Sequence, residues 1–282
     1  MQTLNEKSQL KKAELFKALH TRSGLFVIPN PWDAGSAKIL ASLGFEALAT
    51  TSAGLAISLG KADGEGAVSR ESALENARAI VFATNLPVSA DLENGYGESP
   101  ESCAETILLA AQAGLVGCTI EDTTGVAGDP ILPFELSVAR IRAAVKAVAS
   151  LSFPFMLTAR AENFIYGRPD LKDTIRRLEA FADAGADVLY APGLKTRVEI
   201  DAVMKAISPK PVNVLLGVSN SDLSINELAD IGVKRVSLGS TLARTAYSAL
   251  LSAGEEIRQK GTVAFASETI PYGTLNALFR SF

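Results

Sequence analysis

The chain has 282 residues, of which 48% are hydrophobic, 21% are charged and 6% are aromatic. This length fits one large α/β barrel or two ordinary domains, and the composition is sufficient for a large core of aliphatic residues. The formal net charge is −4, with Lys and Arg scattered along the chain, so the basic stripe of a nucleic-acid-binding protein and a polybasic membrane patch are both excluded.

A junction that recurs four times indicates how the chain is organised. Each copy is an Ala-rich helical stretch, then a glycine, then a short apolar run, and the glycines are Gly44, Gly114, Gly185 and Gly232. A glycine at the end of a helix supplies the left-handed residue that terminates it. Helices that alternate with strands in this way predict a parallel sheet.

Eight strands are predicted in chain order, at 25–29, 47–51, 88–92, 117–121, 155–160, 188–191, 212–215 and 236–238. Helical patterns separate them, for example at 100–113, 136–149, 171–184 and 225–230. Eight such units predict an α/β fold, the (β/α)₈ TIM barrel. A doubly wound open sheet is the alternative, but the Pro-Asn-Pro-Trp stretch after the first strand is not the glycine-rich turn expected of it.

The C-terminal part, 241–282, is longer than a barrel requires. It contains a helical stretch at 241–260 and a segment at 268–282 that is rich in Leu, Phe and Tyr. Its apolar residues could cover the bottom of the barrel or pack on another subunit. No linker or domain boundary is visible, so we expect residues 1–282 to form a single barrel domain.

Cysteine and histidine are rare, and this limits the chemistry. Cys103 and Cys118 are too few for a disulfide framework, and Cys118 lies in an apolar run, as a core residue would. His20, the one histidine, precedes the first strand, so neither a histidine-based triad nor a His-rich zinc site is expected. A polar N-terminus without a signal peptide, and no apolar run of about 18 residues, predict a cytoplasmic protein that does not contact membranes.

Acidic side chains follow two neighbouring strands, at the end of the barrel where active sites form. Asp91 and Glu93 are two residues apart at the end of the third strand, so their side chains point the same way, and Glu121 ends the fourth strand. Three carboxylates in a small space repel one another unless a cation or a proton intervenes. Oxygen ligands alone favour Mg²⁺ or Mn²⁺ over Zn²⁺. The alternative is that these acids cap helices or pair with Arg160.

Two other strand ends could bind an anion. Arg160 follows an apolar strand, where a guanidinium needs a carboxylate or phosphate partner, so it could bind a substrate anion or pair with Glu162 or Glu121. The small-residue stretch after the second strand could cradle a carboxylate with its backbone N–H groups. Its residues are Ser52, Ala53, Gly54 and Leu55.

Six short motifs follow one another from about residue 24 to the C-terminus. They are Pro-Asn-Pro-Trp-Asp-Ala-Gly-Ser at 29–36, Asp-Leu-Glu-Asn-Gly-Tyr-Gly at 91–97, Ile-Glu-Asp at 120–122, Thr-Ala-Arg-Ala-Glu at 158–162, Arg-Val-Ser-Leu-Gly at 235–239 and Ile-Pro-Tyr-Gly-Thr-Leu-Asn at 270–276. This ordered set resembles the isocitrate lyase/phosphoenolpyruvate mutase superfamily. The resemblance implies a barrel whose last helix is swapped between paired subunits, in a homodimer or homotetramer.

The resemblance also implies roles for individual residues. Asp91, Glu93 and Glu121 match the acids that hold Mg²⁺, and Asp63 matches an acid in the metal's surroundings. Residues 52–55 match the segment whose backbone binds the substrate carboxylate, beside Asp91. Arg160 matches a substrate-binding arginine.

Asn213 falls near another substrate contact of the family. Arg160, Asp63 and Glu121 are therefore the candidate catalytic residues. The implied chemistry breaks or forms a bond next to an α-keto acid or 2-hydroxy acid, with the metal stabilising an enolate.

The chain departs from the superfamily in the loop at 123–133. Lyases of the family carry Lys-x-Cys-Gly-His there, and mutases carry Lys and Asn, whereas this loop has no Cys, His, Lys or Asn. The departure favours oxaloacetate decarboxylation or hydrolysis, or another keto-acid lyase reaction, over cleavage of isocitrate or methylisocitrate. A phosphonomutase-like reaction, a Schiff-base aldolase that uses Lys195, and a keto-acid binder without activity are the remaining alternatives.

Overall fold

The computed structural model describes residues 6–126 and 128–281 of the chain, and it contains one eight-stranded parallel sheet. The strands are β1 (Phe26–Ile28), β2 (Leu48–Ala49), β3 (Val88–Asp91), β4 (Gly117–Glu121), β5 (Met156–Arg160), β6 (Val188–Tyr190), β7 (Val212–Leu215) and β8 (Arg235–Ser237). Their order is β1-β8-β7-β6-β5-β4-β3-β2. The backbone N–H of Ala49 donates to the carbonyl oxygen of Pro29 at 3.1 Å, which links β2 back to the β1 side and nearly closes the barrel. The predicted (β/α)₈ fold is confirmed.

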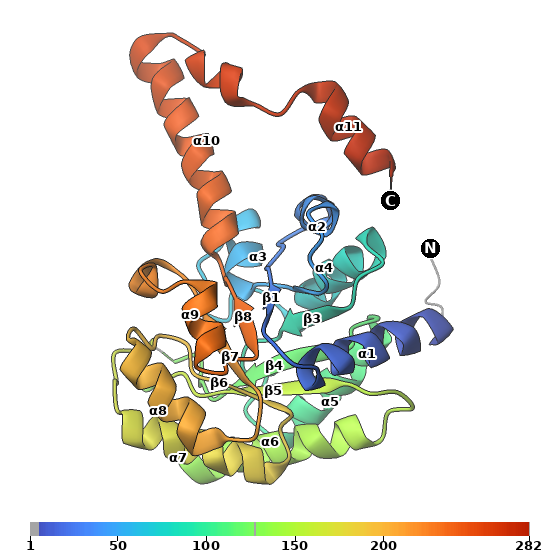
Figure 1. Ribbon diagram of the computed structural model, residues 1–282, viewed down its shortest axis with the longest axis vertical. Coiled ribbons are helices and arrows are strands. Elements are labelled where there is room, and N and C mark those ends of the chain that lie inside the picture. Colours follow the sequence, from blue (N-terminus) through green and yellow to red (C-terminus); the bar gives the residue numbers. More distant parts are fainter. Residues whose placement is uncertain (1–5, 127, 282) are drawn as a thin grey trace.

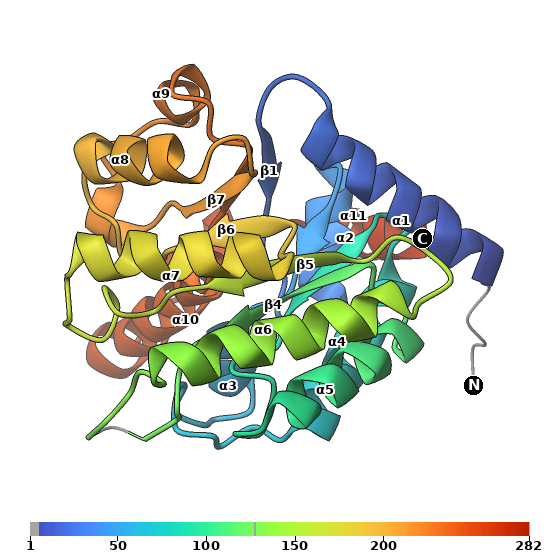
Figure 2. The ribbon, with the colours of Figure 1, turned by 90° about the horizontal axis from the view of Figure 1, so that it is seen from below.

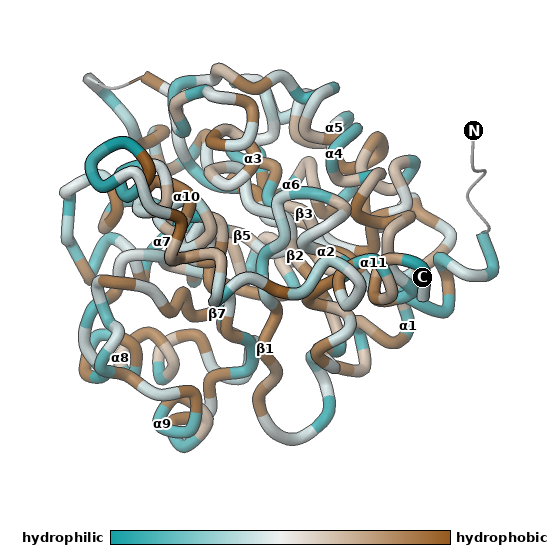
Figure 3. The backbone as a smooth tube through the Cα atoms, turned by 90° about the horizontal axis from the view of Figure 1, so that it is seen from above, coloured by the Kyte–Doolittle hydropathy of each residue, from teal (hydrophilic) through white to brown (hydrophobic). Residues whose placement is uncertain are grey.

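Helices surround these strands, as Figure 2 shows from below. They are α1 (Glu6–Thr21), α2 (Ala34–Ser42), α3 (Ser52–Ser58), α4 (Arg70–Ala83), α5 (Pro100–Gln112), α6 (Phe134–Ala149), α7 (Leu171–Ala184), α8 (Arg197–Ile207), α9 (Ile225–Asp230), α10 (Thr241–Lys260) and α11 (Tyr272–Arg280). Two short 3₁₀ helices, η1 (Val218–Asn220) and η2 (Ala264–Glu268), lie in the connections. Seen from above, the residues of the strands are mainly hydrophobic, and hydrophilic residues are most frequent in the outer turns (Figure 3). Cys118 is fully buried in this core, as predicted.

The N-terminal ends of the strands are covered by α1, and not by the C-terminal tail. Ala13, Phe16 and Leu19 of α1 form a buried cluster with residues at the starts of β1, β5 and β6. The spacing of these three side chains places them on one helix face. The bottom of the barrel, one of the two positions considered for the C-terminal tail, is therefore occupied by α1.

The C-terminal tail begins on the opposite side, because α10 starts four residues after β8 ends. Only Ala243 of its 20 residues is buried, and α10 projects away from the barrel in Figure 1. The chain then turns back, and α11 lies against α2, where the Lys38 ammonium donates to the carbonyl oxygen of Phe279 at 3.0 Å. No helix in the described part of the chain is long and apolar enough to cross a membrane.

Candidate active site

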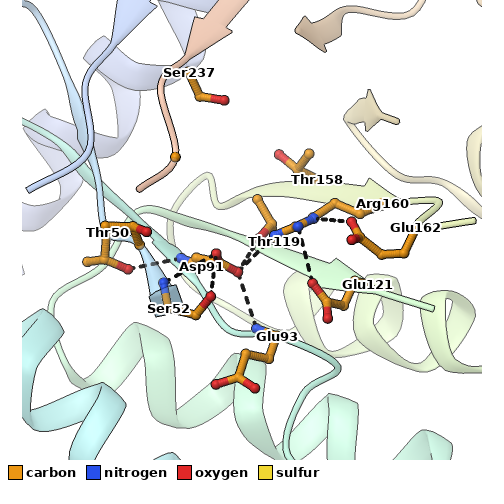
Figure 4. A network of polar contacts seen from close by, with 12 residues as sticks. Thr50, Ser52, Asp91, Glu93, Thr119, Glu121, Thr158, Arg160, Glu162 and Ser237 are labelled. Carbon is orange, nitrogen blue, oxygen red and sulfur yellow. Dashed lines mark hydrogen bonds and ion pairs between the residues drawn. The ribbon is translucent and has the colours of Figure 1, made fainter. Parts of the chain in front are cut away.

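Asp91 lies at the carboxyl end of β3 and is held from several directions (Figure 4). Its Oδ2 accepts hydrogen bonds from the backbone N–H and the hydroxyl of Ser52, at 3.4 and 3.1 Å. Its Oδ1 accepts from the Thr119 hydroxyl at 3.3 Å and from Arg160 Nη1 at 3.0 Å. Its own N–H donates to the Thr50 hydroxyl at 3.0 Å. The carboxylate is therefore fixed in orientation at the carboxyl end of β3.

Arg160, at the end of β5, is the cation of this cluster. Its Nη1, Nη2 and Nε contact one carboxylate each, those of Asp91 at 3.0 Å, Glu121 at 3.3 Å and Glu162 at 2.8 Å. The guanidinium also lies 5.0 Å from the centre of the Tyr190 ring. Burial opposes the charge of Arg160, but the Glu162, Asp91 and Glu121 carboxylates outweigh burial and raise its pKa well above the ordinary value. The predicted pairing of Arg160 with Glu162 or Glu121 is thus present, with Asp91 as a third partner.

The acids nevertheless outnumber the arginine, and burial together with their mutual repulsion raises several of their pKa values. Burial, and then the charges of Asp91, Glu121 and Asp63, raise the pKa of Glu93 to about 8. Burial also raises the pKa of Glu121 and of Glu162, although Arg160 opposes the shift in both. For Asp63, burial and the charge of Asp91 raise the pKa. A second positive charge beside these groups would stabilise their ionised forms.

The loop after β3 has an unusual backbone that sets the place of Glu93. Glu93 and Tyr96 have positive φ angles of 46° and 58°, and Gly95 between them has a φ of 80°. Positive φ is uncommon for residues with a Cβ and persists where the surroundings impose it. The Glu93 carboxylate accepts from the Tyr96 hydroxyl at 3.4 Å and points away from Arg160 in Figure 4.

The donor set fits a hard divalent cation. Asp91, Glu93 and Glu121 offer only carboxylate oxygens, and burial first, with neighbouring carboxylates second, raises the pKa of Glu93 and Glu121. Across residues 6–126 and 128–281, however, no three Asp, Glu, His or Cys side chains converge as a ready-made metal cage. Arg160 contacts both Asp91 and Glu121, and Glu93 turns toward Tyr96. These acids could hold a cation once their side chains reorient.

Two adjoining cavities lie beside the acids. One, of about 180 Å³, enters the barrel and is lined by residues of several strand ends, among them Ser52, Ala53, Asp63, Asp91, Arg160, Tyr190, Asn213, Arg235 and Ser237. The other, of about 450 Å³, is lined by Glu93, Tyr96, Glu121, Thr123 and Tyr166 among others. The acids therefore border both a narrow inner space and a wider outer one, an arrangement suited to a small polar ligand.

The structure brings most of the predicted site residues together, with two exceptions in the small-residue stretch. Ser52 and Ala53 line the inner cavity, but Gly54 and Leu55 are buried behind them as part of α3. The Gly54 N–H donates to the Thr51 hydroxyl at 3.2 Å, and the Leu55 N–H donates to the Thr51 carbonyl oxygen at 3.0 Å. The Gly54 and Leu55 amides are thus already engaged, and the Ser52 amide donates to Asp91.

The loop at 123–133 is held to the strand end that it follows. Thr123 pairs with Ile131 in an antiparallel bridge, and the Thr123 hydroxyl donates to Glu121 at 2.8 Å. The Leu132 N–H donates to the carbonyl oxygen of Asp122 at 2.8 Å. Lys195, the alternative nucleophile, is exposed at the start of α8 and does not line either cavity.

Sequence reasoning missed several residues of the site. Thr50 and Thr119 bond to Asp91; Thr50 directly follows β2, a position that could have indicated this, whereas Thr119 lies in the middle of β4. Tyr96 lay inside a quoted motif, but its bond to Glu93 depends on the left-handed loop. Tyr190 stacks on Arg160 from the next strand, and Arg235 reaches the cavity from the start of β8. No local pattern distinguishes Tyr190 from a core residue, and Arg235 stands in the Arg-Val-Ser-Leu-Gly motif at 235–239 without a pattern that assigns it a role.

The comparison with known proteins agrees with this geometry. Residues 16–258 match the family model described as phosphoenolpyruvate phosphomutase. The chain belongs to this family. It is an enzyme of the phosphoenolpyruvate mutase/isocitrate lyase superfamily, a group whose named relatives are lyases, mutases and decarboxylases.

Individual relatives span nearly the whole chain. An uncharacterised protein of Mycobacterium tuberculosis is 31% identical over 268 residues, which cover 93% of this chain and 95% of the relative. An oxaloacetate decarboxylase of Pseudomonas putida is 28% identical and covers 78% of this chain and 76% of its own length.

Two solved structures show the same fold. A Burkholderia cenocepacia protein, assigned provisionally to the lyase/mutase class, is 54% identical with a TM-score of 0.94, covering 97% of each chain. An oxaloacetate acetylhydrolase in complex with its product oxalate is 26% identical with a TM-score of 0.86, covering 96% of this chain and 94% of that one.

Proposed function

We propose that this enzyme is a Mg²⁺- or Mn²⁺-dependent lyase or hydrolase that cleaves a carbon–carbon bond next to the keto group of a small dicarboxylate, with oxaloacetate as the model substrate. The observation that carries the proposal is the group Asp91, Glu121 and Arg160, in which Asp91 and Arg160 line the 180 Å³ cavity and Glu121 lines the 450 Å³ one. Both the P. putida decarboxylase and the acetylhydrolase named above act on oxaloacetate, which supports this substrate class.

Asp91, Glu93 and Glu121 would hold the cation, directly or through water, with Asp63 near it. When bound there, a divalent cation supplies Lewis-acid stabilisation of the negative charge that develops on the keto oxygen. The Arg160 guanidinium lines the inner cavity and would orient a substrate carboxylate there, beside Ser52 and Ala53 at the start of α3. In this proposal the chain's own residues bind and orient the substrate.

The composition of the 123–133 loop favours decarboxylation within this class, because hydrolysis also requires a base that takes a proton from the attacking water. Cleavage of a 2-hydroxy acid requires a base that removes the hydroxyl proton, and the loop offers no Cys, His or Lys for that step. In decarboxylation the C3–C4 bond breaks, its electron pair remains as the enolate, CO₂ leaves and solvent supplies one proton to C3. That sequence needs no protein base.

The test is a coupled assay of pyruvate and oxalate release from oxaloacetate, phosphonopyruvate, methylisocitrate and dimethylmalate, with and without EDTA. We expect turnover of oxaloacetate that EDTA abolishes. Asp91→Ala should lower it by about 10³-fold or more, while Glu101→Gln, at an exposed acid in the first turn of α5, should match the wild type. Metal-dependent binding without turnover of any substrate would instead favour the keto-acid binder.

We also propose that α10 packs on a second copy of the chain, in a homodimer or homotetramer with swapped helices. Its support is the exposure of large apolar side chains along the tail, 66% for Leu250, 65% for Leu251 and 51% for Ile257. Light scattering after gel filtration should give at least a dimer for the wild type. Leu250→Asp should shift the mass toward the monomer, whereas a wild-type monomer would contradict the proposal.

A further inference from the structure

Arg235 is a buried cation beneath the inner cavity, and the hydrogen-bond partners found for it in the described part of the chain are neutral. It begins β8, is 3% exposed and lines the 180 Å³ cavity. Its Nε donates to Asn213 Oδ1 at 2.8 Å, and its Nη2 donates to the Thr158 hydroxyl at 2.9 Å. Its Nη1 lies 3.3 Å from His20 Nε2. None of these partners offers a negative charge.

The His20 contact does not add a counter-charge. His20 Nδ1 lies 2.8 Å from the Phe16 carbonyl oxygen, so Nδ1 carries the proton and Nε2 accepts from Arg235. Burial, and then the charge of Arg235, lower the pKa of His20 to about 3, which keeps the ring neutral. Within residues 6–126 and 128–281, no carboxylate forms an ion pair with Arg235. Buried charges are normally paired, so this lone guanidinium is unusual.

The other basic residue of the cavity differs in this respect. The described lining residues include two arginines, and Arg160 is already matched by the carboxylates of Asp91, Glu121 and Glu162. Thr158 and Arg160 are two residues apart on β5 and face the same side of the strand. Arg235, bonded to Thr158, therefore lies one layer deeper than Arg160, and no acid among the described residues forms an ion pair with it.

Arg235 also fixes the polar surface above it. Because its Nε occupies the amide oxygen of Asn213, the amide nitrogen points the other way and donates to the Ser237 hydroxyl at 2.9 Å. Ser237 and Asn213 both line the cavity. The guanidinium thus sets the orientation of the Asn213 amide. An incoming ligand meets the NH₂ group of this amide, a donor, and not its oxygen, an acceptor.

We propose that Arg235 is a specificity-determining residue, the counter-charge that makes this cavity select a dianionic ligand, one with two carboxylates, over a monoanionic keto acid. This inference rests on the proposed function, since it concerns the ligand of the same cavity. Arg235 acts through its field and through Asn213, and not by taking part in bond cleavage. A guanidinium in a water-poor interior acts over several ångströms with little screening.

The test compares oxalate with oxamate, which has the same shape and one charge fewer, by isothermal titration in the presence of Mg²⁺. We expect Arg235→Gln to lower the oxalate/oxamate affinity ratio about tenfold or more. Arg235→Lys should keep the ratio within about threefold of the wild type, because it keeps the charge. Thr158→Val is the matched control: it removes one hydrogen bond to Arg235, leaves its charge, and should also preserve the ratio.

A second variant covers the case in which Arg235→Gln does not fold. Asn213→Asp retains the acceptor for Arg235 Nε and adds a counter-charge, so it should lower the ratio in the same direction. The inference is overturned if the wild type binds oxalate and the oxalate/oxamate affinity ratio is unchanged in Arg235→Gln or in Asn213→Asp. That result would leave the proposed function intact. No Mg²⁺-dependent oxalate binding by the wild type would contradict the proposed function itself.

Discussion

Replacing Arg140 tests whether a helix outside the barrel holds the loop that carries Glu93 in place through hydrogen bonds. Arg140 lies on α6, is 1% exposed, and reaches the loop after β3. Its Nη1 donates to the carbonyl oxygens of Gly97, at 2.5 Å, and Ser99, at 3.4 Å, and its Nη2 donates to that of Asn94. The left-handed turn leaves these oxygens without partners from regular secondary structure, so the guanidinium satisfies them.

The magnitude follows from these contacts. A hydrogen bond from a charged donor contributes about 1.5–3 kcal/mol, and unpaired buried carbonyls add a cost of similar size. The Nε of Arg140, buried without a partner among the described residues, already costs stability that a substitution would recover. We therefore expect Arg140→Met to lower the free energy of unfolding by about 3 kcal/mol and to weaken Mn²⁺ binding about tenfold. Arg140→Lys should have a free energy of unfolding and a Mn²⁺ affinity between those of the wild type and Arg140→Met, because one ammonium cannot reach all three carbonyl oxygens.

Urea unfolding and Mn²⁺ titration of the same samples provide the assay. Arg142→Met is the matched control, since Arg142 is exposed on the same helix and its loss should change the free energy of unfolding by no more than about 0.5 kcal/mol. A free energy of unfolding for Arg140→Met equal to that of the control would show that Arg140 does not stabilise the loop after β3. The reasoning is also refuted if stability falls and Mn²⁺ affinity does not, because Arg140 would then not position Glu93.

Three further predictions address the buried charges. His20 has a folded pKa of about 3 and an unfolded value near 6.5, so the unfolded chain binds the extra proton and stability falls as pH drops through this window. Between about pH 7 and pH 5, His20→Gln should lose about 2 kcal/mol less unfolding free energy than the wild type, and equal losses would contradict this. Asp122→Asn breaks a buried pair with Arg177 (3.0 Å) and should cost about 3 kcal/mol in urea unfolding, against about 0.5 kcal/mol or less for the exposed Asp129→Asn. Glu93→Gln removes one of the crowded acids, so calorimetry should show a higher melting temperature for the metal-free protein and titration a weaker Mn²⁺ affinity; a lower melting temperature would count against the charge surplus.

The strands and the acidic site residues could be predicted from the sequence because both are marked by short local patterns. Each predicted strand overlaps an observed one, since short apolar runs that follow a glycine or a proline have few other ways to be buried. In a closed parallel barrel the carboxyl ends of all strands meet at one side. Asp91, Glu121 and Arg160 could therefore be placed together without knowing any contact between them.

Contacts between distant segments were not accessible in this way. His20 and Arg235 are 215 positions apart, and neither has a local signature of burial beside the other. The clamp from Arg140 to Asn94 and Gly97 depends on how α6 lies over a left-handed turn. The polar composition of residues 1–12 also concealed α1, whose three buried apolar residues lie one helical turn apart.

The most direct test of the central claim is a crystal structure of the protein with Mn²⁺ and oxalate, in which anomalous scattering locates the metal. We predict one Mn²⁺ peak ligated by Asp91, with Glu93 and Glu121 contacting it directly or through water. Oxalate should lie between the metal and Arg160, in the inner cavity. An occupied Mn²⁺ site elsewhere, or oxalate bound in that cavity without any metal, would contradict the account.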